Sequence, residues 1–129
     1  MNIYESAEDY LEAILALKER LGSVRSIDIV REKNFSKPSV SIAMKKLREN
    51  GYIAVDGEGN LTLLEPGLEI AQRIYSRHQL LTHFFVQLGV DEQTAAEDAC
   101  KAEHILSEQT LEKIRESALR NDAAHPQAK

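Results

Sequence analysis

The feature that most restricts the fold of this chain is a change of hydrophobic period at Asn50 and Gly51. Before these residues, apolar side chains recur three and four positions apart, which predicts a helix that runs up to this point. Its expected core face consists of Val40, Ala43, Met44 and Leu47. After it, residues 52–55 and 61–64 have strand composition and are separated by a run of turn-forming residues. The sequence therefore predicts a helix that leads directly into a β-hairpin.

A shorter helix comes before this one and completes a helix-turn-helix. Ser26 can cap a helix over 27–33, and a short turn follows it. Ser36 can cap the next helix. Pro38 is tolerated in the first turn of that helix, because the N–H that proline lacks would have no partner there. Two short helices joined by a tight turn and followed by a hairpin are typical of a winged helix. An amphipathic helix ending at Gly22 precedes them.

The second half of the chain is predicted to be helical throughout. Pro66 opens a long apolar helix that ends at Gly89, residues 91–106 form another helix, and Ser107 caps the last one. These helices carry more apolar side chains than one small helical layer can cover, so we expect this half to form a homodimer. The side chains in question are Phe84, Phe85, Leu88, Ile105, Leu106, Ile114 and Leu119.

Positive charge is concentrated on the helix-turn-helix, although the chain of 129 residues has a net charge of −5. Between Arg25 and Asn50 there are seven basic residues against three acidic ones. Basic side chains are also normal on any solvated helix, but their position on this element favours contact with DNA phosphates. An exposed Ile42 opposite the core would suit a thymine methyl group. The candidate DNA-binding residues are Arg25, Ser36, Lys37, Pro38, Ser39, Ile42, Lys45 and Lys46.

Cysteine usage and hydropathy indicate a cytoplasmic setting. Cys100 is the only cysteine, so no disulfide can form within the chain, and the N-terminus does not resemble a signal peptide. No apolar run is long enough to span a membrane. A catalytic role is not expected, because the sequence has neither a nucleophile motif nor a phosphate-binding glycine loop.

Side chains that can bind a metal occur on three of the predicted helices. Cys100, Glu103 and His104 are three and four positions apart, so a helix would place them on one face. Taken alone, they could equally be a buried cysteine, a solvated carboxylate and a partly buried imidazole. Asp9 and Glu12 share a face of the first helix, and His78 lies on the long one. Six such groups from three segments favour a divalent metal site.

The order of these motifs resembles the diphtheria toxin repressor and manganese transport regulator family of metal-activated bacterial repressors. The motifs are an Asp-Tyr-Leu-Glu first helix, a winged helix, Tyr-x-Arg-His on a long helix, and Cys-x-x-Glu-His. The resemblance implies a homodimer that binds operator DNA when it is loaded with Mn(II) or Fe(II) and so controls metal homeostasis genes. It also implies the short form of the family, which lacks a C-terminal SH3-like domain.

The resemblance assigns metal ligands residue by residue. It implies ligand roles for Asp9, Glu12, His78, Cys100, Glu103 and His104. Asp9 is typical of the manganese-type members, whereas cysteine at position 100 is typical of the iron-type members. Thr82 is a poor ligand for a second metal, and Glu97 could take its place, so one or two metals per subunit remain open.

The predicted fold class is mainly α, with an N-terminal winged helix-turn-helix and a two-stranded wing. Residues 1–65 are expected to bind DNA, residues 66–120 to bind metal and dimerise, and residues 121–129 to form a disordered tail. Two alternatives are a winged-helix regulator that does not sense metal and a small metallohydrolase.

Overall fold

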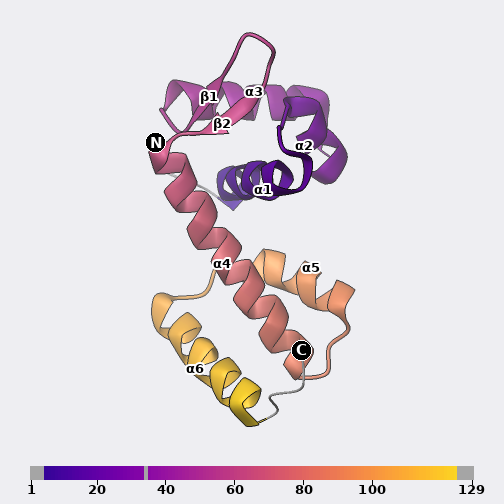
Figure 1. Ribbon diagram of the computed structural model, residues 1–129, viewed down its shortest axis with the longest axis vertical. Helices are drawn as coiled ribbons and strands as arrows, with labels where there is room; N and C mark the ends of the chain where they lie inside the picture. Colours follow the sequence, from indigo (N-terminus) through magenta and orange to yellow (C-terminus); the bar gives the residue numbers. More distant parts are fainter. Residues whose placement is uncertain (1–4, 34, 125–129) are drawn as a thin grey trace. The chain divides into compact units, whose positions relative to one another are not determined.

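The computed structural model describes residues 5–33 and 35–124 and is mainly helical. Figure 1 shows the elements in chain order. They are α1 (Glu5–Leu21), α2 (Ser26–Lys33), α3 (Lys37–Glu49), β1 (Ile53–Val55), β2 (Leu61–Leu63), α4 (Glu65–Gln87), α5 (Glu92–Ala102) and α6 (Glu108–Ala124). The chain forms two compact units, Met1–Tyr75 and Ser76–Lys129, with the boundary inside α4. The predicted fold class is confirmed.

The first unit is a three-helix core with a small sheet against it. Val40, Met44 and Leu47 of α3 are each less than 5% exposed, so the core face predicted from their spacing is correct, with Ala43 packed beside them. Burying apolar side chains of this size stabilises the fold by about 1.5–3 kcal/mol each. The other fully buried large side chains of this unit are Leu11, Ile14, Leu17, Val24, Ile29, Ile53 and Ile74.

The ends of α3 lie where the sequence predicts them. The Ser36 hydroxyl accepts the backbone N–H of Ser39 at 3.2 Å, so Ser36 is the N-cap. At the other end Gly51 has φ of +80°, a left-handed conformation that glycine adopts without a steric penalty. The chain reverses there and enters the hairpin.

The wing is an antiparallel pair in which Ile53 faces Leu63 and Val55 faces Leu61. Its turn is closed by Asp56, whose carboxylate accepts the N–H groups of Glu58 and Asn60. These hydrogen bonds lower the pKa of Asp56, and the bond from the backbone N–H of Asn60 makes the largest contribution. The wing is also tied to the segment before α2, because Leu61 N–H donates to Val24 O at 2.7 Å.

The second unit contains the rest of α4 together with α5 and α6. Leu81, Ala99 and Leu111 form its buried centre, one from each helix. Against them pack Leu80, Phe85, Ala102, Leu106 and Ile114. No helix in the described part of the chain is long and apolar enough to cross a membrane.

Two predicted boundaries in this unit differ from the structure. The helix expected over 91–106 ends at Ala102. The last helix continues to Ala124, so residues 121–124 are helical although we expected a disordered tail from 121 onward. The remainder of that tail, 125–129, lies outside the described residues.

Gly67, in the first turn of α4, provides a test of packing in the first unit. A Cβ atom at this position would overlap the carbonyl oxygen of Tyr52 and lie 3.4 Å from Leu11 Cδ2. Alanine is intrinsically better than glycine in a helix by about 1 kcal/mol. We nevertheless expect Gly67→Ala to lower the free energy of unfolding by about 1–3 kcal/mol, because Tyr52 is held by its hydrogen bond to Leu64 N–H.

Urea unfolding followed by circular dichroism would measure this change. Gly57→Ala is the matched control, because a Cβ at Gly57 meets nothing within 4 Å. Equal stabilities for the two variants would contradict the close packing of α4 on the base of the wing.

Candidate metal centre and nucleic-acid interface

A buried carboxylate forms the centre of the polar cluster in the second unit. Glu103 is fully buried, and its Oε2 lies 3.0 Å from Nδ1 of His78 on α4. Its Oε1 lies 3.5 Å from Nε2 of His104, whose side chain is only 2% exposed. Burying a carboxylate is costly unless it has hydrogen bonds or a cation, so the two imidazoles are its structural partners.

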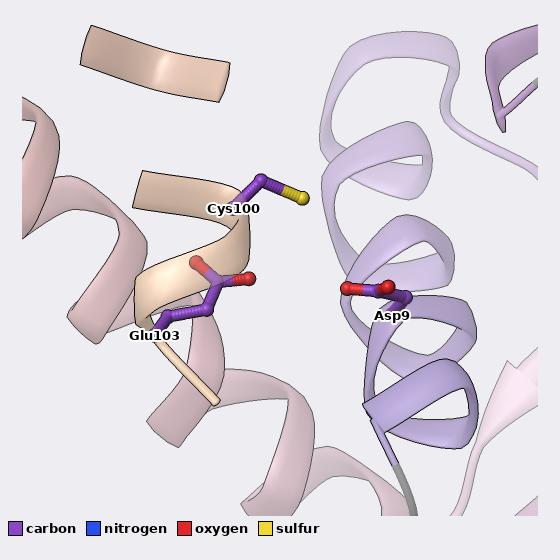
Figure 2. A group of neighbouring side chains, drawn as sticks. All are labelled: Asp9, Cys100 and Glu103. Carbon is purple, nitrogen blue, oxygen red and sulfur yellow. The ribbon is translucent and has the colours of Figure 1, made fainter. Parts of the chain in front are cut away.

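Cys100 adds a thiol to this cluster. It lies one turn before Glu103, and Figure 2 shows both side chains leaving the same side of the α5 segment. The sulfur atom and a Glu103 carboxylate oxygen are within 4.8 Å of each other. Thiolate, carboxylate and imidazole are all ligands of divalent transition metals, so this donor set fits such an ion.

The cluster is built from a helix end and a turn, not from one continuous helix. Glu103 is the C-cap of α5, and its N–H donates to Ala99 O. His104 lies in the turn that follows, contrary to the expectation that it shares a helical face with Cys100. Despite that difference, the structure brings together four of the predicted ligands, namely His78, Cys100, Glu103 and His104.

The two remaining predicted ligands belong to α1 in the first unit. Glu12 is 6% exposed and Asp9 is partly buried. A buried glutamate is unusual on a helix that otherwise buries Leu11, Ala13 and Ile14. Burial, with a smaller contribution from the charge of Asp9, raises the pKa of the neighbouring Tyr10.

Other polar residues of the second unit are not assigned to this cluster of metal-capable side chains. His83 pairs with Asp122 at 2.9 Å, and Gln87 donates hydrogen bonds to Asp122 and to Ala118 O. This network holds the end of α6 against α4 and had no signal in the sequence. Thr82 remains a poor ligand candidate, and Glu97 is exposed on α5.

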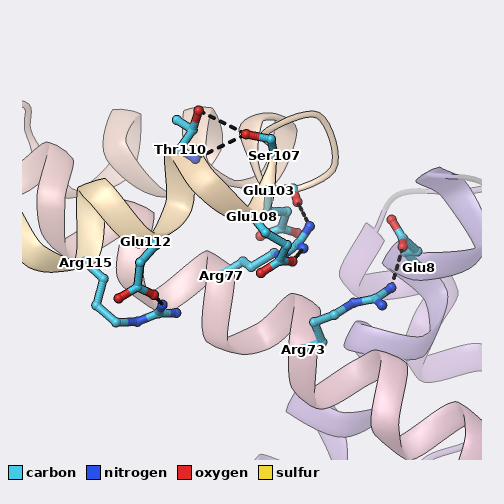
Figure 3. Close-up of polar contacts among 9 residues, drawn as sticks. All are labelled: Glu8, Arg73, Arg77, Glu103, Ser107, Glu108, Thr110, Glu112 and Arg115. Carbon is cyan, nitrogen blue, oxygen red and sulfur yellow. Dashed lines mark hydrogen bonds and ion pairs between the residues drawn. The ribbon is translucent and has the colours of Figure 1, made fainter.

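Sequence reasoning did not assign a role to Arg77, although Arg77 and His78 belong to one of the family's motifs. Its guanidinium donates to Glu103 O at 3.1 Å and forms an ion pair with Glu108, as Figure 3 shows. The signal that could have found it is the adjacency of an arginine to the predicted ligand His78.

The candidate nucleic-acid interface is the outer face of α3 with the segment before α2. The predicted residues Ser36, Lys37, Pro38, Ser39, Ile42, Lys45 and Lys46 are all exposed. Ile42 is 57% exposed, which is high for an isoleucine on a helix whose opposite face is core. Arg25 is exposed, and its guanidinium lies against Gly59 in the turn of the wing. A Cβ atom built on Gly59 would be 3.3 Å from this guanidinium.

A winged helix with an exposed basic recognition helix, joined to a unit with a buried set of metal-capable side chains, defines a class of metal-responsive DNA-binding proteins. Residues 2–61 match the family model of the iron dependent repressor N-terminal DNA binding domain. Residues 64–126 match the model of the iron dependent repressor metal binding and dimerisation domain. The chain belongs to the iron-dependent repressor family of transcriptional regulators, which confirms the resemblance seen in the sequence.

Individual relatives agree with this assignment. The chain is 38% identical over 113 residues to an uncharacterized HTH-type transcriptional regulator of Methanocaldococcus jannaschii, covering 86% of this chain and 90% of that protein. It is 33% identical over 111 residues to the transcriptional regulator MntR of Escherichia coli O157:H7, covering 86% and 72% respectively.

Solved structures with the same fold include manganese regulators. A manganese-dependent transcriptional repressor in complex with manganese has a TM-score of 0.79 and 27% identity, over 87% of this chain and 52% of that one. The manganese regulator SloR has a TM-score of 0.77 and 27% identity, over 94% and 55%. The chain thus spans about half the length of these solved relatives.

Proposed function

We propose that this chain is a metal-activated transcriptional repressor that binds operator DNA as a homodimer and controls metal homeostasis genes. The observation that carries the proposal is the buried Glu103 carboxylate between two imidazoles and beside a thiol. Carboxylate, imidazole and thiolate are all ligands of divalent transition metals, so this donor set fits such a cation. A repressor of chromosomal genes acts in the cytoplasm, as the sequence also suggested.

We propose that the metal ligands come from both units of the chain. The second unit offers His78, Cys100, Glu103 and His104, and α1 offers Asp9 and Glu12. Support comes from the agreement of each position with the family's ligand motifs. When bound, Mn(II) or Fe(II) supplies the positive charge that these acidic side chains need. The oxygen ligands suit Mn(II), whereas the Cys100 thiolate favours softer ions.

The ligand set suggests how metal binding controls DNA binding. Asp9, Glu12 and Glu103 are acidic, so they repel one another when no cation is near. Coordination of one ion by both sets of ligands ties α1, and with it the winged helix, to the dimerising unit. This selects one spacing of the two recognition helices before DNA arrives. Because coupling is reciprocal, operator DNA should tighten metal binding by the same factor.

The proposed DNA face combines non-specific and specific contacts. Lys37, Lys45 and Lys46 are exposed on α3, and in this proposal they contact phosphates, which gives affinity that falls with salt. Ser39 and Ile42 project from the N-terminal half of α3, where recognition helices contact base edges. In a two-fold dimer the two recognition helices lie about one DNA turn, ~34 Å, or a multiple of it, apart.

We propose that the homodimer forms through apolar side chains of the second unit that its own core leaves uncovered. Leu88, Ile105 and Leu119 are 64%, 76% and 62% exposed. Phe84, Phe85, Leu106 and Ile114, which we also expected at the dimer surface, are partly buried, and the last three pack against the core of this unit. The exposed three are therefore the better candidates for contacts with a second copy.

Loss of one imidazole tests the metal centre. We expect His104→Ala to weaken Mn(II) and Fe(II) binding by at least ~100-fold, since even removal of a residue that only orients a ligand typically costs 10- to 100-fold. The fold and the dimer should be retained. Equilibrium dialysis in anaerobic buffer measures the affinity, and binding to an operator selected from random DNA measures the response.

His83→Ala is the matched control, because His83 lies outside the cluster and pairs with Asp122. It should keep the metal affinity and the metal-dependent DNA binding. The proposal would be falsified if His104→Ala bound the operator with unchanged affinity and an unchanged response to metal.

Replacement of the thiol tests metal preference. Cys100→Glu converts the site to oxygen and nitrogen ligands only, which suits harder ions. We expect the ratio of Mn(II) affinity to Zn(II) and Co(II) affinity to rise relative to the unchanged protein. Competition dialysis with pairs of metals measures this ratio, and a ratio that stays constant would show that Cys100 is not a ligand.

Two kinds of substitution on α3 test the DNA face. Lys45→Ala with Lys46→Ala should weaken binding to all DNA sequences and flatten the salt dependence by about one unit for each phosphate that is no longer neutralised. Ile42→Ala should instead relax the preference at one base pair. Lys18→Ala, an exposed lysine near the end of α1, is the control and should change neither property.

Fluorescence anisotropy with selected and random DNA at several salt concentrations separates these effects. If the lysine changes and Ile42→Ala acted identically on both DNAs, the assignment of the recognition face would be wrong.

A further inference from the structure

Arg77 makes two charge-assisted contacts to the connection between α5 and α6. One nitrogen of its guanidinium donates to the backbone oxygen of Glu103 at 3.1 Å. The other forms an ion pair with the Glu108 carboxylate in the first turn of α6. The Arg77 side chain is only 15% exposed and its bond to Glu103 O is partly buried, whereas the Glu108 side chain is 79% exposed, so the ion pair is open to water. Figure 3 shows the two contacts diverging from one guanidinium.

The contact to Glu103 lies at the C-terminal end of α5, where Glu103 is the C-cap. In a continuing helix the carbonyl of Glu103 would accept the N–H of Ser107 four residues later. Here Arg77 takes this carbonyl, and the Ser107 hydroxyl instead accepts the N–H of Thr110 as the cap of α6. A cation is also favourable at a helix C-terminus because of the helix dipole.

The same connection carries two of the proposed metal ligands. Glu103 carries the anchored carbonyl, His104 lies between it and the capped start of α6, and His78 follows Arg77 directly in α4. Fixing the backbone oxygen of Glu103 restricts the direction of its side chain. The rigid, forked guanidinium can hold this oxygen and Glu108 together, which an ammonium group does less well.

We propose that Arg77 is a positioning residue of the metal centre, which orders Glu103 and His104 for coordination before an ion binds. The inference rests on the proposed assignment of these two side chains as metal ligands. Other arginine pairs lack this arrangement. Arg115 bonds to Glu112 within α6, and Arg73 bonds to Glu8 of α1, so neither holds the connection that carries the ligands.

The experiment compares Arg77→Gln, Arg77→Lys and Glu108→Gln, with Arg115→Gln as the matched control. The first readout is amide hydrogen exchange without metal at Glu103, Ile105 and Leu106, whose N–H groups bond to Ala99 and Ala102. The second is Mn(II) affinity by anaerobic equilibrium dialysis. Thermal unfolding checks that each variant is folded.

We expect Arg77→Gln to speed exchange at these three amides and to weaken Mn(II) binding by about 10- to 100-fold, the usual effect of removing a residue that orients a ligand. Arg77→Lys should be intermediate, because it keeps the charge but not the fork. Glu108→Gln should cost less than Arg77→Gln, because the bond to Glu103 O remains. Arg115→Gln should match the unchanged protein in both readouts.

Unchanged Mn(II) affinity or unchanged amide exchange in folded Arg77→Gln would overturn the inference while leaving the proposed function intact. If Arg77→Gln does not fold, the same two measurements on Arg77→Lys test the inference, and unchanged Mn(II) affinity or amide exchange in that variant would overturn it. Failure of the unchanged protein to bind either Mn(II) or Fe(II) would contradict the proposed function instead.

Discussion

The burial of one carboxylate, that of Glu103, is the constraint on which the second unit of this protein depends. A fully buried glutamate needs partners, and here His78 and His104 face its two oxygens while Cys100 lies close by. These side chains come from α4, α5 and the turn that follows, so the arrangement exists only when the helices pack around Leu81, Ala99 and Leu111. Folding of this unit therefore preorganises a set of donors for a divalent ion.

The termination of α5 links that site to the rest of its unit. Because Arg77 on α4 holds the C-cap carbonyl of α5 and the first turn of α6, a single side chain bridges three helices around the proposed ligands. The opposite end of α6 is held by the polar network of His83, Gln87 and Asp122. The proposed metal centre is thus linked by direct contacts to α6, whose exposed Leu119 belongs to the proposed dimer surface.

The first unit is held together mainly by apolar packing. Its core is wholly apolar apart from the buried Glu12, and its outer face carries the exposed lysines and Ile42 of α3. Gly67 allows the start of α4 to approach the base of the wing closely. This combination gives a packed platform whose exposed residues are proposed to meet DNA, and an acidic helix, α1, through which metal binding is proposed to act.

The sequence by itself determined the local elements and the chemical types of the site. Periods of 3.6 and 2, the caps Ser36 and Ser107, and the glycine at position 51 depend on neighbours a few residues apart, so they could be read directly. The ligand types were also evident, and their order identified the family. Tertiary structure alone placed Arg77, which is 26 residues away in the sequence, against the backbone oxygen of Glu103, the C-cap of α5. It likewise decided that Phe85 and Leu106 face the core while Ile105 is exposed, since burial depends on contacts between helices that no local period encodes.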